Sequence, residues 1–280
     1  MMRVTLFGTR GSLAAPGAET SRYGGNTSTV EVRGNDGTVL ILDAGTGIRQ
    51  LGAQIQTDTI RIDILLTHLH MDHIQGLGFF GPLYNPGIEV HIWGPASSTL
   101  SLGARLSRYL SPPLFPVHLR DLPCVTCHPV PFSPFEIGPF RVQASLVCHP
   151  GPTVGYRIEA ADGCATYLPD HEPALGLPDG RWPNPEWISG YKLAADSDLL
   201  IHDAQYTDEE YAHCNGWGHS TYRHAFEFAA AVRAKELVPF HHDPSHDDDM
   251  LTGLMETAKR QFNPDFKVSA GYEGAVFEVG

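Results

Sequence analysis

Positive charge and long apolar runs are both scarce in this sequence. Its 280 residues include 19 lysines and arginines against 32 aspartates and glutamates, which gives a net charge of −13. Nucleic-acid binding normally depends on a basic surface that neutralises phosphates, so a long nucleic acid is not an expected partner. No stretch reaches the roughly 18–20 apolar residues of a membrane span, and the first residues lack a secretory signal. We therefore expect a soluble, cytoplasmic protein with no membrane partner.

Cysteine is also scarce, with five residues spread along the chain. An odd and scattered set is unlike the disulfide framework of a small secreted domain, so we expect reduced thiols. Residues 124–128, with the sequence CVTCH, match the attachment pattern of c-type haem. That interpretation requires export to an oxidising compartment, and the alternative is a loop with two unpaired thiols.

Histidine, glycine and proline are plentiful by contrast. The chain contains 15 His, 29 Gly and 22 Pro, while 42% of its residues are hydrophobic and 18% are charged, as is ordinary for a packed globular protein. Imidazoles bind metals and transfer protons, and glycines and prolines form tight turns and rigid loops. This is the composition of a loop-rich enzyme. We expect one domain over residues 1–280.

Strand patterns occur in both halves of the chain, and helical patterns follow each set. Runs of β-branched and aliphatic residues predict a β-meander in the first half and a second series of strands later. Two such halves predict two sheets face to face with helices outside, an α/β architecture. The predicted strands are residues 3–7, 28–32, 38–42, 62–66, 140–147, 154–159, 165–168, 199–202 and 236–240, and the predicted helices are residues 47–56, 97–110, 221–234 and 249–261.

Two long segments are expected to be irregular. Residues 111–134 are rich in proline and predict a loop, and residues 172–192, rich in Pro, Gly and Trp, predict a surface excursion within the domain. Long irregular loops in a compact domain are often functional.

The strongest chemical signal is the sequence THLHMDH at residues 67–73, directly after the apolar run 62–66. It places three imidazoles and a carboxylate at the end of a buried strand, where they converge only if the chain turns sharply. Such a density of His and carboxylate donors suits zinc or a similar borderline metal. A single ion could not use all four groups and keep a position open, so two ions, roughly 3.5–4 Å apart, are the natural inference. These groups are His68, His70, Asp72 and His73.

Residues 68–73 match the H-x-H-x-D-H motif in full, and the sequence resembles the metallo-β-lactamase superfamily over nearly its whole length. Later motifs of that family are matched by His149 after a strand, by Asp170 in the sequence YLPD, and by His241 in the sequence VPFH. An early aspartate of the family corresponds to Asp43, behind the site. The resemblance implies a four-layer αββα metallo-β-lactamase-like sandwich with the site at the strand ends.

The resemblance also divides the ligands between two divalent ions. It implies one ion held by His68, His70 and His149, and a second held by Asp72, His73 and His241, with Asp170 bridging both. The iron-binding branch of the family typically has Glu at the position of His70. Imidazole in its place moves the preference toward Zn²⁺, with Mn²⁺ as an alternative.

The sequence GWGHST at residues 216–221 resembles the phosphodiesterase branch of this superfamily, which includes ribonuclease Z, cyclic-phosphate hydrolases and cyclic nucleotide phosphodiesterases. Ser220 and Thr221 are good N-cap residues, so the helix start is expected to face an anionic group. We expect Asp72 to be a catalytic metal ligand. His219, oriented by Asp203, is expected to act as the general acid while a metal-bound hydroxide attacks the phosphodiester.

The expected substrate is a small phosphodiester such as a cyclic nucleotide. Ribonuclease Z usually has a long arm that grips tRNA, whereas residues 172–192 form only a short interval in an acidic chain. A base could stack on an aromatic side chain. The candidates for that contact are Tyr109, Phe115, Tyr156, Trp182 and Trp187. Similarity alone suggests a homodimer.

The polar cluster directly after the last predicted ligand is interpreted as a solvated rim. Its members are His242, Asp243, His246 and Asp247.

Three alternative functions stay open. The same two ions could hydrolyse a carboxylic ester, lactone or thioester, because metal-activated water attacks carbonyl and phosphoryl centres alike. The enzyme could instead process tRNA 3′ ends as ribonuclease Z does. A non-catalytic binding protein that keeps the fold as a scaffold is the third, and the intact ligand set argues against it.

Overall fold

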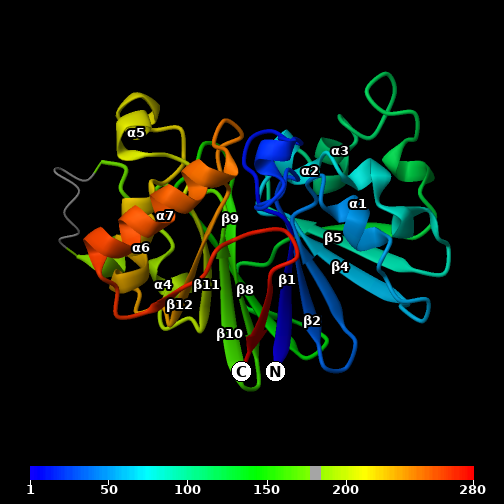
Figure 1. Cartoon of the computed structure of the whole chain (residues 1–280). Helices are drawn as coiled ribbons and strands as arrows, with labels where there is room; N and C mark the ends of the chain where they lie inside the picture. Colours follow the sequence, from blue (N-terminus) through cyan, green and yellow to red (C-terminus); the bar gives the residue numbers. More distant parts are fainter. Residues whose placement is uncertain (177–183) are drawn as a thin grey trace.

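The computed structural model describes residues 1–176 and 184–280, and in them two seven-stranded sheets lie face to face. Helices cover the outer face of each sheet (Figure 1). Because each sheet buries one face against the other and one face under helices, the chain folds as the predicted four-layer αββα sandwich.

The first sheet has the strand order β14-β1-β2-β3-β4-β5-β6. Its strands β14, β1, β2 and β3 are antiparallel, but β3, β4, β5 and β6 are parallel. The predicted β-meander is therefore wrong beyond β3, since parallel neighbours need crossover connections rather than hairpins. The strands are β1 (Met2–Gly8), β2 (Thr29–Gly34), β3 (Val39–Leu42), β4 (Arg61–Leu65), β5 (Glu89–Gly94), β6 (Val125–Pro129) and β14 (Val276–Val279).

The second sheet has the order β13-β12-β11-β10-β9-β8-β7. Strands β7 to β10 are antiparallel, and β10 to β13 are parallel. The carboxyl ends of β10, β11 and β12 therefore meet at one edge, which is where functional loops gather in such sheets. The strands are β7 (Phe135–Ile137), β8 (Phe140–Leu146), β9 (Val154–Ala160), β10 (Gly163–Leu168), β11 (Leu199–Asp203), β12 (Glu236–Phe240) and β13 (Lys267–Val268).

The helices form two groups, one for each sheet. Helices α1 (Ile48–Gly52), α2 (Met71–Ile74) and α3 (Leu102–Leu106) pack outside the first sheet, and α4 (Tyr191–Ala194), α5 (Asp208–Cys214), α6 (Tyr222–Ala231) and α7 (Asp248–Phe262) lie beside the second sheet (Figure 1). The two predicted helices of the second half are confirmed to within a few residues. The two of the first half are wrong in length, since each forms only five helical residues.

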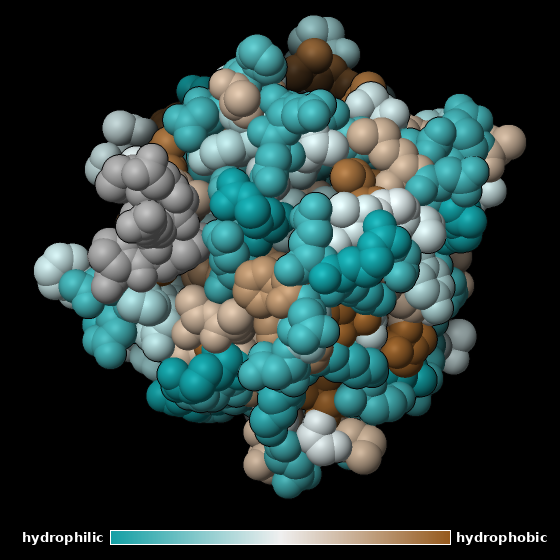
Figure 2. Space-filling model, turned by 60° about the vertical axis from the view of Figure 1, so that its left-hand side comes forward, coloured by the Kyte–Doolittle hydropathy of each residue, from teal (hydrophilic) through white to brown (hydrophobic). Residues whose placement is uncertain are grey.

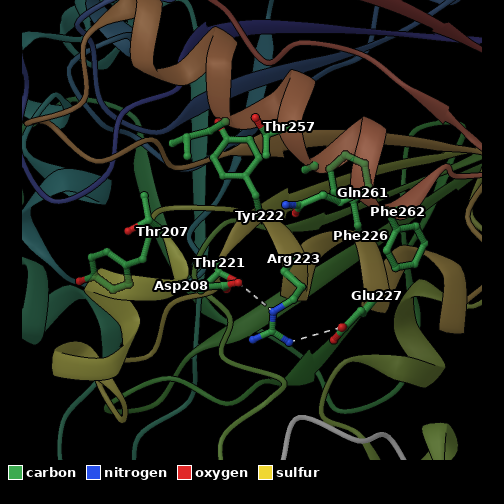
Figure 3. Close-up of a pocket in the computed structure, with 13 residues that line it drawn as sticks. Thr207, Asp208, Thr221, Tyr222, Arg223, Phe226, Glu227, Thr257, Gln261 and Phe262 are labelled. Carbon is green, nitrogen blue, oxygen red and sulfur yellow. Dashed lines mark hydrogen bonds and ion pairs between the residues drawn. The ribbon is translucent and has the colours of Figure 1, made fainter.

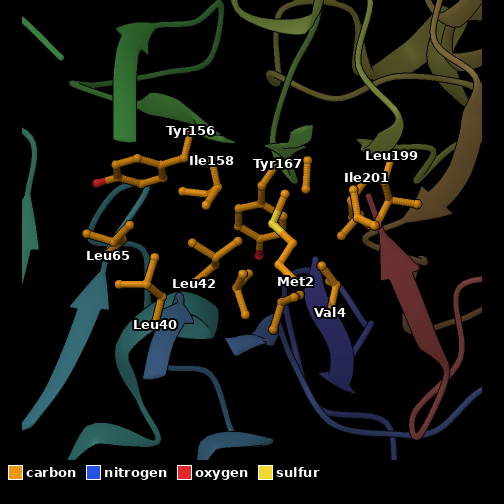
Figure 4. Close-up of a cluster of buried hydrophobic side chains, with 14 of the residues drawn as sticks. Met2, Val4, Leu40, Leu42, Leu65, Tyr156, Ile158, Tyr167, Leu199 and Ile201 are labelled. Atoms are coloured by element: carbon orange, nitrogen blue, oxygen red, sulfur yellow. The ribbon is translucent and has the colours of Figure 1, made fainter. Parts of the chain in front are cut away.

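The main core lies between the two sheets (Figure 4). Side chains of β1, β3 and β4 meet side chains of β9, β10 and β11 there, and they are almost completely buried. Burial of such aliphatic and aromatic groups stabilises the fold by about 1.5–3 kcal/mol per large side chain. The labelled members are Met2, Val4, Leu40, Leu42, Leu65, Tyr156, Ile158, Tyr167, Leu199 and Ile201.

The Pro-rich segment 111–134 is not the uniform loop that its composition predicts. It contains the short 3-10 turn Leu119–Asp121 and the edge strand β6. The haem-like pattern ends on this strand, where Cys127 packs against the outer core while the His128 ring stacks on Trp93. Consecutive strand residues point to opposite faces, so these two side chains do not converge on one ring system. All five cysteines are free thiols.

The predicted surface excursion 172–192 starts inside the protein, because Glu172 is only 1% exposed. Its residues 177–183 lie outside the described part of the chain. The 3-10 turn Pro185–Trp187 follows, and the Trp187 side chain is exposed. Among the described residues, no helix has both the length and the apolar character required to cross a bilayer.

Candidate metal centre

The turn after β4 directs the predicted motif into one place. Asp43, at the end of β3, accepts hydrogen bonds from the Thr67 backbone N–H and hydroxyl, at 2.7 and 3.0 Å from Oδ1. This holds the chain as it leaves β4 and delivers His68 and His70 to the loop, with Asp72 and His73 on the first turn of α2. Neighbouring strand ends supply the remaining groups, since His149 follows β8, Asp170 follows β10 and His241 follows β12.

The first group of candidate ligands consists of His68, His70 and His149. One nitrogen of each lies within 4.8 Å of the others. The Nδ1 atom of His70 lies 3.2 Å from Nε2 of His149. His68 is buried and His70 is exposed, so this group is the solvent-facing side of the cluster.

The second group is completely buried and consists of Asp72, His73, Asp170 and His241. The Nε2 atoms of His73 and His241 are 3.3 Å apart. Each of these two nitrogens lies 3.2 Å from Oδ2 of Asp72. The Asp72 carboxylate also accepts a hydrogen bond of 2.8 Å from the Ser12 backbone N–H, which fixes its orientation.

Asp170 lies between the two groups with one carboxylate oxygen toward each. Its Oδ2 is 3.7 Å from Nε2 of His68 and 3.8 Å from Nε2 of His149. Its Oδ1 is 2.9 Å from Nε2 of His73 and 3.3 Å from Nε2 of His241. This is the arrangement that a carboxylate shared by two cations requires.

The carboxylates of the cluster stabilise positive charge placed between them, as the pKa shifts of its members show. Burial alone would lower the pKa of His73, but Asp170, Asp72 and Asp43 raise it well above its usual value. Burial would raise the pKa of Asp170, yet the histidines around it hold it well below its usual range. The pKa of His68 is lowered by burial and by His73, which leaves a neutral imidazole.

The residues fit a pair of divalent cations. The buried Nε2 of His68 has no hydrogen-bond partner among the described residues, which is costly unless a cation uses it. Nε2 of His73 and Nε2 of His241 are 3.3 Å apart, and Nδ1 of His70 and Nε2 of His149 are 3.2 Å apart, so each pair of nitrogens can share one cation. A divalent cation would take the place of the proton that the surrounding carboxylates otherwise hold on His73. Imidazole and carboxylate donors are those that zinc and similar ions prefer.

Further groups orient the candidate ligands from behind, as is usual for metal-bound histidines. The Nδ1 atom of His73 lies 2.8 Å from Oδ2 of Asp43, and Nδ1 of His241 lies 2.8 Å from Oε1 of Gln205. Tyr167 donates a hydrogen bond of 3.0 Å to Asp43. Sequence reasoning found Asp43 but missed Gln205, whose only signal is its position two residues after the strand-ending Asp203.

His219 lies at the edge of the same cluster. Its Nδ1 is 2.7 Å from Oδ2 of Asp203 and 4.0 Å from Oδ2 of Asp170. Its ring stacks on His241, with centroids 4.9 Å apart. Burial would lower the pKa of His219, but the Asp203 carboxylate outweighs burial and raises it to about 9. The structure thus brings the predicted His219–Asp203 pair beside all seven predicted ligands.

The prediction that the helix start at Ser220 and Thr221 faces an anionic group is wrong, because protein groups already occupy these residues. The Ser220 backbone N–H donates to Asp203 at 3.1 Å, and its hydroxyl donates to the His171 carbonyl at 2.6 Å. Thr221 is the N-cap of α6 and forms a capping box with His224. These groups therefore stabilise the loop that carries His219.

Several other predicted site residues have structural roles instead. His242 and His246 are buried, with Nε2 atoms 2.8 Å from the Gly271 carbonyl and from a Glu210 carboxylate oxygen respectively, so the prediction of a solvated rim is wrong for them. Tyr156 and Phe115 are core residues, and the Tyr109 hydroxyl donates to the Gln75 carbonyl. The candidate Trp182 lies outside the described residues. Trp187 alone of the described candidates is exposed.

A separate cavity of about 280 Å³ lies between α6 and α7 (Figure 3). Phe226 and Phe262 line it together with Gln261 and Thr257, and Arg223 bonds to Asp208 and Glu227 at its rim. It contains none of the predicted ligands. Hydrophilic residues predominate on the face of the molecule that Figure 2 shows, with hydrophobic residues scattered among them.

Comparison with known proteins assigns the chain to a family. A model described as the β-lactamase superfamily domain matches residues 38–242, so the chain belongs to the β-lactamase superfamily. The ribonuclease Z of Myxococcus xanthus (strain DK1622) is 25% identical over 322 residues, covering 100% of this chain and 98% of that protein. The predicted resemblance to the branch that contains ribonuclease Z is confirmed, as is the class of metal-dependent hydrolase.

Solved structures share the fold over the whole chain. A diphosphatase from the PhnP family is 19% identical with a TM-score of 0.70, and the match covers 100% of this chain and 98% of that one. The short form of human tRNase Z is 23% identical with a TM-score of 0.66, and the match covers 99% of each chain. At these identities the likeness concerns the fold.

Proposed function

We propose that this protein is a two-metal phosphodiesterase whose substrate is a small phosphodiester, with a cyclic nucleotide as the leading candidate. The observation that carries the proposal is the Asp203–His219 pair beside the ligand cluster, with His219 Nδ1 2.7 Å from Asp203 and 4.0 Å from Asp170. Phosphodiester cleavage releases a strongly basic alkoxide, which needs such an acid, whereas hydrolysis of an activated ester does not.

The proposed ligands are His68, His70 and His149 for one ion and Asp72, His73 and His241 for the other, with Asp170 shared. Two divalent ions held there, most simply Zn²⁺, would supply Lewis-acid activation of water and of the phosphoryl group. The exposed edge at His70 is the side from which substrate reaches the cluster.

The protein's own contribution centres on His219. Asp203 fixes Nδ1 of the ring, so Nε2 holds the proton that passes to the leaving oxygen. A well-positioned acid of this kind contributes about 10²–10⁴ in rate. Asp72 accepts a hydrogen bond from the Ser12 N–H, which fixes the position of its carboxylate as a ligand in the second group.

RNA is the competing substrate, because curated relatives carry the name ribonuclease Z. The net charge of −13 disfavours a long polyanion, since phosphate contacts normally come from lysine and arginine. A compact substrate needs only the cluster and its rim.

A substrate panel tests the proposal. Protein reconstituted with Zn²⁺ or Mn²⁺ is assayed on bis-p-nitrophenyl phosphate, 3′,5′- and 2′,3′-cyclic mononucleotides, p-nitrophenyl acetate and a precursor tRNA. We expect turnover of the diesters and of at least one cyclic nucleotide, and loss of that turnover in Asp170→Ala. Turnover of the acyl ester alone would overturn the phosphodiesterase assignment, and cleavage of precursor tRNA without any cyclic nucleotide would assign the chain to tRNA processing.

A further inference from the structure

Glu172 is a buried carboxylate that the mechanism above does not use. It lies two residues after Asp170 and is 1% exposed. Its Oε1 accepts hydrogen bonds of 2.8 Å from the Tyr211 hydroxyl and from the Gly216 backbone N–H, and its Oε2 accepts one of 2.7 Å from the Gly218 N–H. Within the described residues, no Lys or Arg forms an ion pair with it. Burying a carboxylate is costly, and here hydrogen bonds alone offset the cost.

These hydrogen bonds form a closed ring that includes a candidate metal ligand. The Gly218 carbonyl accepts a hydrogen bond of 2.9 Å from Nδ1 of His149. The Glu172 backbone N–H in turn donates to the carbonyl of Cys148, the residue before His149, also at 2.9 Å. Glu172 thus holds His149 in two ways. It holds the imidazole through Gly218, and it holds the backbone through the carbonyl of Cys148. Since Nδ1 of His149 carries the proton, Nε2 of the same imidazole presents its lone pair to the cluster of candidate ligands.

Gly218 gives the ring its tight geometry. Its φ is +94°, a conformation that favours glycine, and a Cβ atom there would lie 2.2 Å from Nδ1 of His149. The backbone can approach the imidazole this closely only because no side chain intervenes. His219 is the next residue, so the same contact also fixes the backbone position of the proposed general acid.

We propose that Glu172 is a positioning residue for the ion held by His68, His70 and His149. It holds the loop 215–218 against His149 and thereby fixes the tautomer and the direction of that ligand. The inference rests on the ligand assignment in the proposed function. A purely structural role would instead weaken both ions and the fold together.

Metal binding tests this inference without any assay of activity. Chelator-stripped protein is titrated with Zn²⁺ against a chromophoric competitor, which gives the number of ions per chain and the affinity of each. In Glu172→Gln an amide N–H₂ replaces one accepting oxygen and repels a backbone N–H. We expect one ion to bind about 10–100-fold more weakly, the usual effect of losing an outer hydrogen-bond partner, while the affinity of the other changes far less.

Two matched variants separate positioning from structure. Tyr211→Phe removes one donor to Glu172 but keeps both backbone N–H contacts, so it should bind both ions like the unmodified protein. Gly218→Ala disturbs the contact with His149 from the other side and should repeat the selective loss, which decides the matter if Glu172→Gln does not fold. Unchanged affinities in both Glu172→Gln and Gly218→Ala, or equal weakening of both ions, would overturn the inference. Fewer than two ions in the unmodified protein would instead overturn the proposed function.

Discussion

At the scale of single residues, the cluster depends on a few side chains held in unusual backbone conformations. Asp43 and His241 have φ values of 59° and 60°, in the left-handed region that L-residues rarely adopt. Such conformations cost on the order of 1–3 kcal/mol and persist only where the surroundings impose them. Both residues follow strands of the two opposing sheets, so the fold supplies that constraint at the point where the candidate ligands converge.

His219→Ala should affect substrates according to their leaving groups. We expect kcat for a substrate with an alkoxide leaving group to fall by about 10²–10⁴, because that oxygen needs a proton. Hydrolysis of bis-p-nitrophenyl phosphate should fall much less, since p-nitrophenolate leaves without protonation. Steady-state kinetics on both substrates, with metal content measured in parallel, check this.

Asp203→Asn is the matched variant for that experiment, because it keeps the shape of the group beside Nδ1 but removes its charge. It should follow the same leaving-group pattern with a smaller loss. Equal losses on both substrates in His219→Ala would mean that His219 positions the phosphate without serving as the acid. No loss on either would remove the main support for the phosphodiesterase assignment.

At the scale of elements, the capping box at the start of helix α6 contains a histidine, His224, in place of the usual Glu or Gln. His224 donates its backbone N–H to Thr221 Oγ1 at 3.1 Å, and its Nδ1 accepts from the Thr221 N–H. Burial and the Arg223 cation lower the pKa of His224 to about 4. The cap is therefore formed by the neutral ring.

This cap should make stability depend on pH. The folded pKa of about 4 lies below the ordinary value of 6.5, so the folded state binds fewer protons than the unfolded chain. The contribution is complete above pH 6.5 and is lost as pH falls toward 4, by about 3 kcal/mol for a shift of this size. His224→Gln keeps an acceptor at this position. Urea unfolding across this range should give similar stability at pH 7 and a shallower loss in the variant, and parallel curves would contradict the assignment.

The sequence predicts elements and site residues best where the signal is local. The metal-binding motif at residues 68–73, directly after β4, could be predicted from the sequence alone, because four donors fall within six residues at a strand end. His149, Asp170 and His241 needed the order of the family's motifs, since each alone resembles an ordinary loop residue. Glu172 could not be found at all, because its partners Tyr211, Gly216 and Gly218 meet it only in the folded chain. The helices predicted at 47–56 and 97–110 were too long, because apolar spacing continues there into turns.

At the scale of the whole molecule, the candidate ligands come from both sheets. His68, His70, Asp72 and His73 follow β4 of the first sheet, whereas His149, Asp170 and His241 follow strands of the second. An ion bound to both sets holds the two halves together. Because the unfolded chain lacks this arrangement, metal binding adds directly to the free energy of unfolding.

Removal of metal should therefore lower Tm. A site at a free metal concentration 100 times its Kd contributes about 2.7 kcal/mol, which corresponds to several degrees in a chain of this size. Differential scanning calorimetry before and after treatment with a chelator measures the shift. Asp170→Ala, which lacks the shared carboxylate, should show little difference between the two conditions. A Tm that does not respond to the chelator in metal-loaded protein would show that the ions do not join the two halves.

The pairing of β1 with β14 has a consequence for the order of folding. Met2 lies opposite Val279 in this pair, so the contact joins segments separated by almost the whole chain. Contacts between distant segments form slowly, because the entropy cost of closing a long loop comes before any contact energy is gained. Until β14 arrives, β1 presents an open edge with unpaired N–H and C=O groups, which can capture a strand of another molecule. We therefore expect β14 to pair late in folding, and the edge of the first sheet at β1 to be open to self-association until it does.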